Sequence, residues 1–363
     1  MMLTTKIAPT ASRFRGGLQA LAELAATPLA PADYLDLLDP LRSRTDLRAR
    51  IVSVVPETAG ASTVTLRPGR TWAGHRPGQF VRVGVEVDGV RHWRSYSLTS
   101  SPDRADGLLS ITVQSIPDGL VSNQLVCRAQ SGDLVHLAQA AGDFTLPVTL
   151  PAKALFVTAG SGITPVMGML RSHLDELSDV VVVHSAATSQ DTIFGAELRA
   201  MAGSGRLRLV ERHTRRDGRL DPAQLAALVP DLAERETWAC GPGELLDALE
   251  DHWTSAGCVE RLHTERFRAS LVEPGQGGTI AFRRSQRSVE ADGATSLLDA
   301  GEDAGVLMPS GCRMGICFGC VVPLRDGAVR DLRTGDVTLA GPDDEVSIQT
   351  CINAAATACE LDL

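Results

Sequence analysis

The sequence of 363 residues has no long apolar segment, no excess of basic charge and no internal repeat at a solenoid or propeller period. Its longest wholly aliphatic stretches, such as Val180–Val183, are far shorter than the ~20 residues that a membrane-spanning helix needs. Lys and Arg number 35 against 44 Asp and Glu, and this net charge of −9 disfavours a general binder of nucleic acid or of anionic membranes. With 44% hydrophobic residues the chain can build sizeable cores, so we expect a soluble protein.

A targeting signal and a disulfide framework are also absent from the pattern. Residues Leu18–Ala32 are rich in Ala and Leu, but Glu23 interrupts the apolar core that a signal peptide requires. The eight cysteines are even in number, yet four of them fall in a metal-cluster spacing and the others are scattered. We therefore expect a reduced, cytoplasmic protein.

Composition divides the chain into successive blocks, and about 150 residues per domain predicts two to three domains. Short alternating runs, with the hairpin signal Asp88-Gly89 between two of them, indicate an antiparallel barrel. Strands that alternate with helices then indicate a parallel sheet. The expected divisions are a helical extension at 1–48, the barrel at 49–149, the α/β domain at 150–268, a linker at 269–278 and a small module of strands and one helix at 279–363.

Periodicity predicts individual strands and helices in the barrel and in the α/β domain. In the barrel they are the strands Thr63–Arg67, Phe80–Val87, Val90–Leu98 and Leu109–Gln114. In the α/β domain they are the strands Ala154–Thr158, Val180–His184, Leu207–Val210 and Thr237–Cys240, and the helices Pro165–Leu177, Ile193–Met201 and Glu244–Trp253.

The cysteine-rich loop SGCRMGICFGC is the most specific signal. Cys312, Cys317 and Cys320 form a C-x4-C-x2-C run, and Cys351 follows after 30 further residues. This is the ligand spacing of a plant-type [2Fe-2S] cluster. The alternative is structural zinc, which usually uses two C-x2-C pairs, whereas this chain has one. Cys359 is the one plausible substitute ligand.

Two glycine-bearing loops follow expected strands. In TAGSGITP, Gly160 and Gly162 precede a helix, so that backbone N–H groups could face a phosphate. The loop lacks the Gly-Lys-Ser/Thr of an ATP site, and Pro165 replaces the third glycine of a dinucleotide fingerprint. The second loop carries Gly241 and Pro242, and ligands of parallel sheets bind at these strand ends.

The expected barrel carries two polar motifs. Arg94-Ser95-Tyr96-Ser97 lies on a strand, and GLVSNQL begins with a turn and then a helix. Gly119 and Ser122 of the second motif could present N–H and hydroxyl donors to a phosphate.

These motifs, in this order, resemble the ferredoxin–NADP reductase superfamily, and the tail resembles a plant-type ferredoxin fused behind it. RSYS matches the flavin motif, GLVSNQL the pyrophosphate motif, and TAGSGITP and CGP the nicotinamide loops. The whole chain, with its N-terminal block, looks most similar to actinobacterial ferredoxin reductases that supply membrane fatty-acid desaturases. The resemblance implies an antiparallel β-barrel FAD domain, an α/β parallel-sheet NAD(P) domain and an α+β (β-grasp) ferredoxin domain.

It also implies roles for individual residues. Arg94 would contact the flavin phosphate, Tyr96 would pack on the isoalloxazine ring, and Ser97 would hydrogen-bond near the flavin N5. The remaining implied cofactor ligands are Gly119 and Ser122 for the FAD pyrophosphate, and Gly160, Gly162, Thr164, Pro165, Gly241 and Pro242 for the nicotinamide nucleotide. Phe267 takes a place where related reductases often have an aromatic residue, although a core position explains it more simply.

The implied reaction passes electrons from a reduced nicotinamide to FAD, then singly to the cluster and to an external oxygenase or desaturase. With a membrane desaturase as acceptor, the resemblance implies peripheral contact with the membrane partner. No acidic residue follows Ser185 directly, and Arg212, Arg215 and Arg216 follow the next strand, which favours NADPH over NADH. His184, His213 and His263 receive no catalytic role. Residues 277–363 hold seven basic and thirteen acidic side chains, so an acidic face could steer docking, or serve solubility alone.

Two rival functions remain open. One is an FMN- and NADH-dependent reductase of a ring-hydroxylating oxygenase, against which GLVSNQL argues because that motif suits the larger flavin. The other is a non-catalytic iron–sulfur redox sensor, which would need neither glycine loop.

Overall fold

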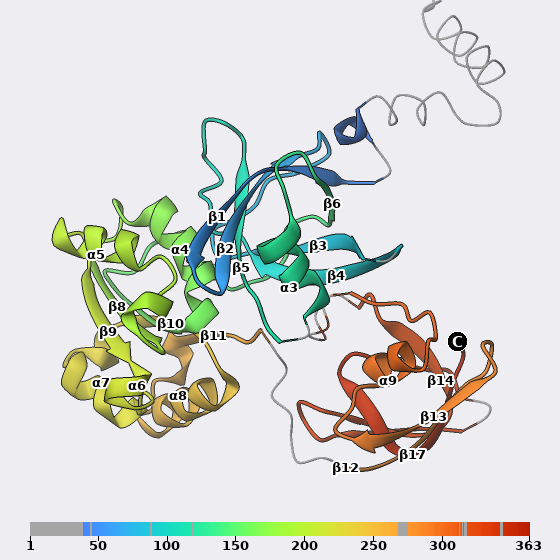
Figure 1. Ribbon diagram of the computed structural model, residues 1–363. Coiled ribbons are helices and arrows are strands. Elements are labelled where there is room, and N and C mark those ends of the chain that lie inside the picture. Colours follow the sequence, from blue (N-terminus) through green and yellow to red (C-terminus); the bar gives the residue numbers. More distant parts are fainter. Residues whose placement is uncertain are drawn as a thin grey trace, which may run out of the picture.

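The computed structural model describes residues 39–43, 46–87, 89–117, 119–267, 275–311, 313, 315, 318–341 and 344–363. The chain forms three units in sequence order, each built on its own sheet (Figure 1). The helical block expected at 1–48 lies almost wholly outside the described residues, and of it the short 3-10 helix η1 (Pro40–Arg42) is seen.

The first unit is an antiparallel barrel. Its strands are β1 (Arg48–Thr58), β2 (Ala61–Pro68), β3 (Phe80–Val87), β4 (Val90–Ser97), β5 (Leu109–Gln114) and β6 (Leu134–Leu137), in the spatial order β4-β3-β6-β1-β2-β5. A bridge between Leu98 and Ile111 joins the two edges and closes the sheet. The helix α3 (Leu120–Asn123) and the π-helical turn η2 (Gln124–Arg128) add Val121 and Leu125 to the barrel core.

Alternation along the strands explains the barrel. In β3 the side chains of Val81, Val83 and Val85 are buried, while Arg82 and Glu86 reach outward. The expected hairpin is present, since β3 and β4 pair through to Val87 and Val90 and Gly89 has a φ of 77°. Asp88 lies outside the described residues.

The second unit is a parallel sheet. Its strands are β7 (Lys153–Ala159), β8 (Asp179–Ala186), β9 (Arg208–His213), β10 (Glu236–Cys240) and β11 (Leu262–Glu265), in the order β11-β10-β7-β8-β9. The helices are α4 (Ile163–His173), α5 (Gly195–Gly203), α6 (Thr214–Asp217), α7 (Pro222–Leu228) and α8 (Gly243–Ser255). The short turns η3 (Gly160–Gly162), η4 (Ser189–Asp191), η5 (Leu232–Glu234) and η6 (Val259–Arg261) connect them. Neither α6 nor α7 was predicted from the sequence.

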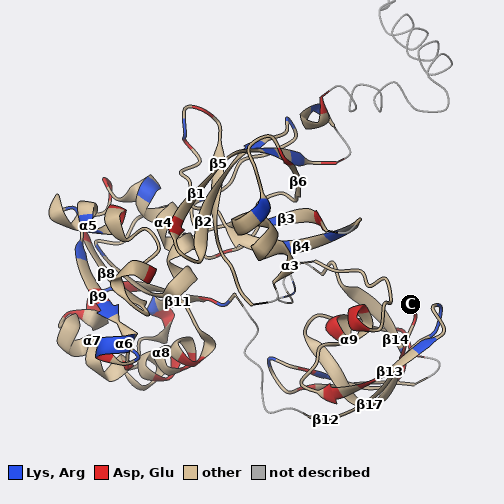
Figure 2. Ribbon diagram, in the orientation of Figure 1, with Lys and Arg blue, Asp and Glu red and all other residues tan. Residues whose placement is uncertain are grey.

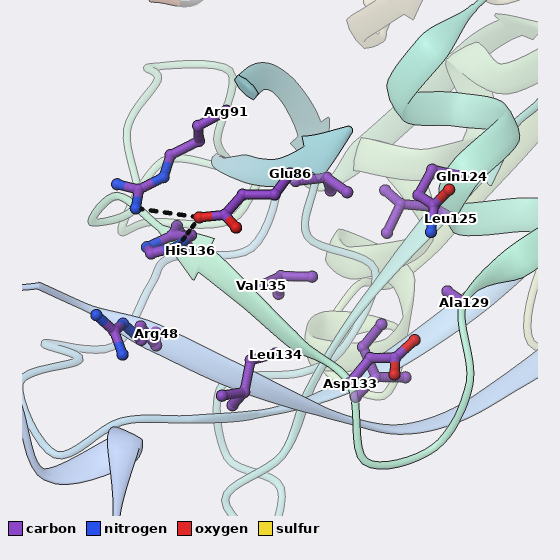
Figure 3. A pocket seen from close by; sticks show the side chains of 12 residues that line it. Arg48, Glu86, Arg91, Gln124, Leu125, Ala129, Asp133, Leu134, Val135 and His136 are labelled. Carbon is purple, nitrogen blue, oxygen red and sulfur yellow. Dashed lines mark ion pairs between the residues drawn. The ribbon is translucent and has the colours of Figure 1, made fainter. Parts of the chain in front are cut away.

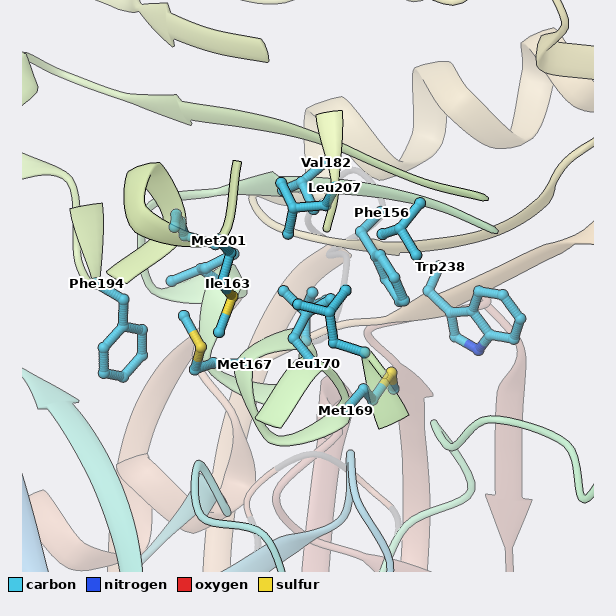
Figure 4. Close-up of a cluster of buried hydrophobic side chains, with 14 of the residues drawn as sticks. Phe156, Ile163, Met167, Met169, Leu170, Val182, Phe194, Met201, Leu207 and Trp238 are labelled. Carbon is cyan, nitrogen blue, oxygen red and sulfur yellow. The ribbon is translucent and has the colours of Figure 1, made fainter. Parts of the chain in front are cut away.

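Apolar residues cover both faces of this sheet, as the continuous hydrophobic runs predicted. On one face Phe156 and Trp238 pack with Met167 and Leu170 of α4 (Figure 4). On the other face α7 and α8 cover alternate residues of the same strands, among them Val157. The carboxyl ends of all five strands therefore meet at one edge.

The third unit is a mixed sheet with one helix. It contains β12 (Gly275–Phe282), β13 (Arg287–Gly293), α9 (Leu297–Asp303), β14 (Val321–Asp331), β15 (Val337–Ala340), β16 (Val346–Gln349) and β17 (Asn353–Leu361). The strand order is β13-β12-β17-β14-β15, with β16 beside β14, and β12 runs parallel to β17. The helix covers the sheet through Leu297 and Leu298. The multidomain fold with these three sheet types is as predicted.

The end of the expected linker at 269–278 needs correction, because β12 begins at Gly275. Its glycines fit close backbone approaches rather than a flexible connection. Gly277 has a φ of 77°, and a Cβ at Gly278 would lie 2.5 Å from the Thr357 carbonyl. Glycine in a strand marks this kind of approach.

No helix in the described part of the chain is both long enough and apolar enough to cross a membrane.

Candidate active site and cluster loop

The RSYS motif lies on β4, an edge strand in the order of the barrel sheet. Tyr96 is largely buried, and this burial raises the pKa of its phenol. The Ser97 hydroxyl is buried and has no hydrogen-bond partner among the described residues. Since a buried polar group without a partner is costly, Ser97 fits a bound group that supplies one. Arg94 donates through Nη1 to the Trp93 carbonyl at 2.8 Å, which leaves other guanidinium donors for a ligand.

The GLVSNQL motif forms the start of α3. Gly119 is the N-cap, and the Ser122 hydroxyl donates to its carbonyl at 3.3 Å. A Cβ at Gly119 would overlap Ser122 Oγ, so the turn requires glycine. Glycine and serine thus meet here as the sequence predicts, and the role of the pair in pyrophosphate binding stays an expectation.

A cleft of about 800 Å³ lies between the barrel and the carboxyl edge of the parallel sheet. Glycine loops after β7 and β10, the end of β8, the start of α6, the segment before α7 and the first turns of α8 line it, together with Gln114 and Phe267. The sequence-predicted residues that it brings together are Gly160, Gly162, Ser185, Gly241, Pro242 and Phe267, and the barrel adds Gln114.

Thr164 and Pro165 do not line this cleft. Both are buried in the first turn of α4, where the Thr164 hydroxyl donates to the Ser161 carbonyl at 2.9 Å. Their position suits them to shaping the loop. Gly162 is sterically required in that loop, because a Cβ there would overlap the Cys240 carbonyl.

Sequence reasoning missed a half-buried acid at the same edge. Glu265, the last residue of β11, is in register with Cys240 of β10. Burial raises the pKa of Glu265 to about 8, and its Oε2 has no partner in the described part of the chain. Burial, then the nearby Glu265, also raises the pKa of the Cys240 thiol. The edge therefore holds a carboxyl that keeps its proton at neutral pH.

The three histidines that received no catalytic role lie in packed positions. His184 is buried with Nδ1 2.8 Å from the Thr158 hydroxyl, and burial lowers its pKa to about 4. His263 stacks on Trp238 at a ring-centroid distance of 4.9 Å. His213 is half-buried at the end of β9.

In the third unit, the Cys320 and Cys351 sulfur atoms are both buried and lie 3.2 Å apart. This distance exceeds the ~2.05 Å of a disulfide bond, so two thiols converge without being bonded. The hydrogen bond between them lowers the pKa of Cys320 to about 6. Cys312 and Cys317 lie outside the described residues. Convergent thiols with thiolate character suit iron, and Cys359 lies apart on β17 with its pKa raised to about 11 by burial.

The backbone around this loop adopts left-handed conformations at several positions. Arg313, Gly315 and Phe318 have φ values of 59°, 75° and 55°. A Cβ at Gly315 would lie 2.9 Å from two Ile352 carbons, which explains this glycine. The loop also meets the barrel, because Arg82 Nη2 on β3 donates to the Ser310 carbonyl at 3.3 Å.

A second cavity, of about 460 Å³, lies at the end of the barrel near the β3–β4 hairpin (Figure 3). Its charged side chains largely neutralise one another. Glu86 lies 3.5 Å from Arg91 and 3.6 Å from His136. It contains none of the sequence-predicted site residues, and we assign it no ligand.

Three family models match the chain in the order that the fold presents. They are an oxidoreductase FAD-binding domain at residues 62–146, an oxidoreductase NAD-binding domain at 156–251 and a 2Fe-2S iron-sulfur cluster binding domain at 280–359.

Individual relatives agree with these domains. The chain is 48% identical to an NADPH oxidoreductase of Mycobacterium tuberculosis, over 96% of this chain and 93% of that protein. It is 32% identical to the ferredoxin reductase component of a 3-ketosteroid-9-alpha-monooxygenase of Mycolicibacterium smegmatis, over 80% of this chain and 89% of that protein. Phthalate dioxygenase reductase has the same fold, with a TM-score of 0.62 at 23% identity, covering 88% of this chain and 98% of that one.

The unpartnered Ser97, the cleft at the sheet edge and the paired thiols all fit the groups that these domains bind. The chain belongs to the ferredoxin–NADP reductase superfamily, among members with a C-terminal plant-type [2Fe-2S] domain, and it is an oxidoreductase that binds FAD, a pyridine nucleotide and a [2Fe-2S] cluster.

Proposed function

We propose that this protein carries electrons from NADPH through FAD and the [2Fe-2S] cluster to an external oxygenase, with a membrane fatty-acid desaturase as the acceptor. The observation that carries the first step is the shared cleft. Gln114 of the barrel and the glycine loops of the parallel sheet line the same cavity. A nicotinamide held by the loops would therefore face a flavin held by the barrel.

When bound, FAD accepts electrons in pairs and releases them singly, which the nicotinamide and the cluster cannot do for each other. The chain supplies placement. Arg94 and the α3 turn would hold the flavin phosphates, and the Ser97 hydroxyl would hydrogen-bond near its N5. Glu265, in register with Cys240, would keep a neutral, proton-bearing carboxyl beside the strand that leads into the Gly241 loop. No protein nucleophile is needed.

The preference for NADPH rests on the ends of β8 and β9. A ribose-binding acid at the end of β8 would favour NADH, and Ser185-Ala186-Ala187 stands there instead. The buried Ser185 hydroxyl has no partner among the described residues. Beyond β9, α6 carries basic residues (Figure 2). Among them Arg215 is exposed, and its guanidinium has no partner in the described part of the chain.

Not every arginine near this edge is available. Arg216 is held by Asp217 at 2.8 and 3.0 Å, and Arg219, which lines the cleft, is paired with Glu244. Arg215 is therefore the best candidate to meet a 2′-phosphate. The M. tuberculosis relative is named for NADPH, which supports the same choice.

An oxygenase acceptor is supported by the names of relatives, among which the M. smegmatis protein is a reductase component of a monooxygenase. The desaturase rests on the sequence resemblance of the whole chain. The excess of acidic residues in the C-terminal unit suits a basic docking surface on the acceptor.

The experiment is a steady-state comparison on the purified holoprotein. We expect kcat/KM for NADPH to exceed that for NADH by about tenfold or more, and Arg215→Ala to remove most of that difference. Electron delivery is tested with a membrane desaturase in lipid vesicles and with a soluble ring-hydroxylating oxygenase. Equal use of both nucleotides would overturn the NADPH assignment, and turnover with the soluble oxygenase alone would overturn the desaturase.

The rivals predict other results. Extraction of FMN would favour the FMN-dependent reductase. Absence of NADPH-dependent ferricyanide reduction would favour the redox sensor.

A further inference from the structure

The helix α4 packs on the barrel directly behind the flavin motif. Gly168, in the middle of α4, faces Leu98, the residue that follows Ser97. A Cβ at Gly168 would lie 2.5 Å from the Leu98 carbonyl oxygen, so no side chain fits there without separating helix and strand. The Leu98 backbone is itself fixed, because its N–H donates to the Gln79 carbonyl at 2.8 Å. The backbones of α4 and the barrel therefore approach each other at Gly168 as closely as a glycine allows.

One turn further along the helix, Arg171 makes a polar contact across the same boundary. Its Nη1 donates to the Thr99 carbonyl at 2.7 Å. Its Nε and Nη2 donate to both carboxylate oxygens of Glu197 on α5, at 2.9 and 2.6 Å. The guanidinium carbon also lies 4.7 Å from the centroid of the Phe194 ring. All three nitrogen atoms of the Arg171 guanidinium therefore have a hydrogen-bond partner, which holds the side chain in place.

These contacts lie between the two halves of the proposed active site. The barrel side, Leu98 and Thr99, continues directly from Tyr96 and Ser97. The helix side is continuous with the nucleotide loop, since α4 begins one residue after Gly162. A rigid helix transmits a shift at Gly168 to its own N-terminus, about 8 Å away at 1.5 Å per residue.

We infer that Gly168 and Arg171 are positioning residues that set the distance between nicotinamide and flavin. The inference rests on the proposed function, because it presumes that hydride passes across this cleft. Such a transfer needs reacting atoms ~3–3.5 Å apart, and a misplacement of about 1 Å can cost about 100-fold in rate. An added methyl group at Gly168 would force a displacement of that order. Neither residue touches the reacting atoms.

The test is rapid mixing of the FAD-loaded holoprotein with NADPH under anaerobic conditions. For Gly168→Ala we expect flavin bleaching to slow about tenfold or more, while the Kd of NADPH changes less than threefold. The long-wavelength charge-transfer absorbance should weaken, because it reports stacking of the two rings, and the kinetic isotope effect with 4-deuterated NADPH should rise toward its intrinsic value. Gly203→Ala is the matched control, since a Cβ at Gly203 meets nothing within 4 Å.

Substitutions of Arg171 give a second, independent test, because they remove contacts and do not add a methyl group to a packed boundary. Arg171→Met should slow bleaching and weaken the charge-transfer band, and Arg171→Lys should restore part of both. Arg199→Met is the matched control, because Arg199 binds Glu211 through two nitrogen atoms, at 2.9 and 2.7 Å, on the same helix layer without contacting the barrel.

The outcomes separate cleanly. Wild-type rates and an unchanged charge-transfer band in Arg171→Met, with either an equal result or failure to fold for Gly168→Ala, would overturn the positioning role. Losses of the same size in Arg199→Met would also overturn it, since they would reflect stability. Failure of NADPH to bleach the wild-type flavin would instead refute the proposed function itself.

Discussion

Ser97, Ser185 and Glu265 are among the residues whose buried polar atoms lack a hydrogen-bond partner in the described part of the chain. Leaving such an atom unsatisfied costs about 1–3 kcal/mol, which proteins tolerate mainly where a ligand completes the bonding. All three lie at the ends of strands, and Ser185 lines the cleft, so these atoms are candidates for contact with flavin and nucleotide.

Glu265 gives a prediction about pH. Its ordinary pKa of 4.5 is raised to about 8, so between these values folding takes up a proton. The free energy of unfolding should therefore fall by about 1.4 kcal/mol per pH unit through this one group as pH rises from 5 to 8. Urea unfolding of the wild type and Glu265→Gln at pH 5, 6, 7 and 8 measures the difference. Glu260→Gln, at an exposed position, should track the wild type; parallel curves for Glu265→Gln would contradict the buried proton.

The cluster cysteines give a prediction about colour and electron path. Cys351→Ser should abolish most of the visible absorbance and EPR signal of the cluster. It should lower NADPH-dependent cytochrome c reduction at least about tenfold, while ferricyanide reduction by the flavin persists. Cys127→Ser, at an exposed cysteine far along the sequence from the loop, is the control. An intact EPR signal in Cys351→Ser would remove this residue from the ligand set.

Among individual residues, the sequence predicted those that belong to a motif or follow directly after an expected strand. Gly160, Gly162, Gly241 and Ser185 do meet in one cleft. Glu265 could not be predicted, because its burial follows from the register of β11 against β10, and no local pattern distinguishes it from a surface acid. The sequence also does not distinguish Arg215 from Arg216, and the structure pairs Arg216 with its neighbour Asp217.

Among the elements, β7, β8 and β10 are tied together at the edge opposite the cleft. Arg235, whose side chain is 5% exposed, binds Asp179 and Asp231 at 2.9 Å and donates to the Ala154 carbonyl at 3.3 Å. One cation thus joins the starts of two strands to the turn before a third. This fixes the amino ends of the strands relative to one another, and so also helps to fix their carboxyl ends at the cleft.

Removing this cation should destabilise the second unit. Arg235→Ala should lower the free energy of unfolding by about 2–4 kcal/mol, below the range for fully buried pairs because both carboxylates keep contact with water. Chemical denaturation followed by intrinsic fluorescence measures it. Arg206→Ala breaks an exposed pair with Asp175 and should cost about 1 kcal/mol or less. A similar small cost for Arg235→Ala would refute the tie.

The strands and longer helices were predictable because period-2 and continuous apolar runs survive into the folded sheets. The expected Phe80–Val87 and Leu109–Gln114 agree with the structure to the residue. The short helices α6 and α7 carry too few turns for a periodic signal. Gly275–Gly278 was interpreted as a linker because glycine density does not distinguish flexibility from close packing between strands.

At the scale of the whole molecule, the cluster loop meets the barrel next to the flavin strand. Arg82 packs over the Trp93 ring at 5.1 Å and holds the Ser310 carbonyl, two residues before Cys312. Within the third unit, Arg313 of the loop is held by Asp299 at 2.7 Å and by Glu302, both on α9. The loop is thus anchored on both of its sides.

This arrangement predicts that Arg82 governs the second electron step. Arg82→Ala should slow cluster reduction about tenfold or more, measured in rapid mixing at cluster wavelengths, while the rate of flavin bleaching by NADPH stays within twofold. Arg50→Ala is the control, because Arg50 also donates to a backbone carbonyl of the barrel but lies away from the loop. An unchanged rate of cluster reduction in Arg82→Ala would show that this contact is dispensable.

The central claim is that one chain conducts electrons from NADPH to FAD and then to a [2Fe-2S] cluster. Anaerobic rapid mixing of the wild-type holoprotein with NADPH, followed across the visible spectrum and by freeze-quench EPR, tests it most directly. We predict that flavin absorbance falls first and that the signal of a reduced [2Fe-2S] cluster then rises as flavin is partly reoxidised. A chain that holds zinc in place of iron, or a cluster that stays oxidised while the flavin is reduced, would contradict the account.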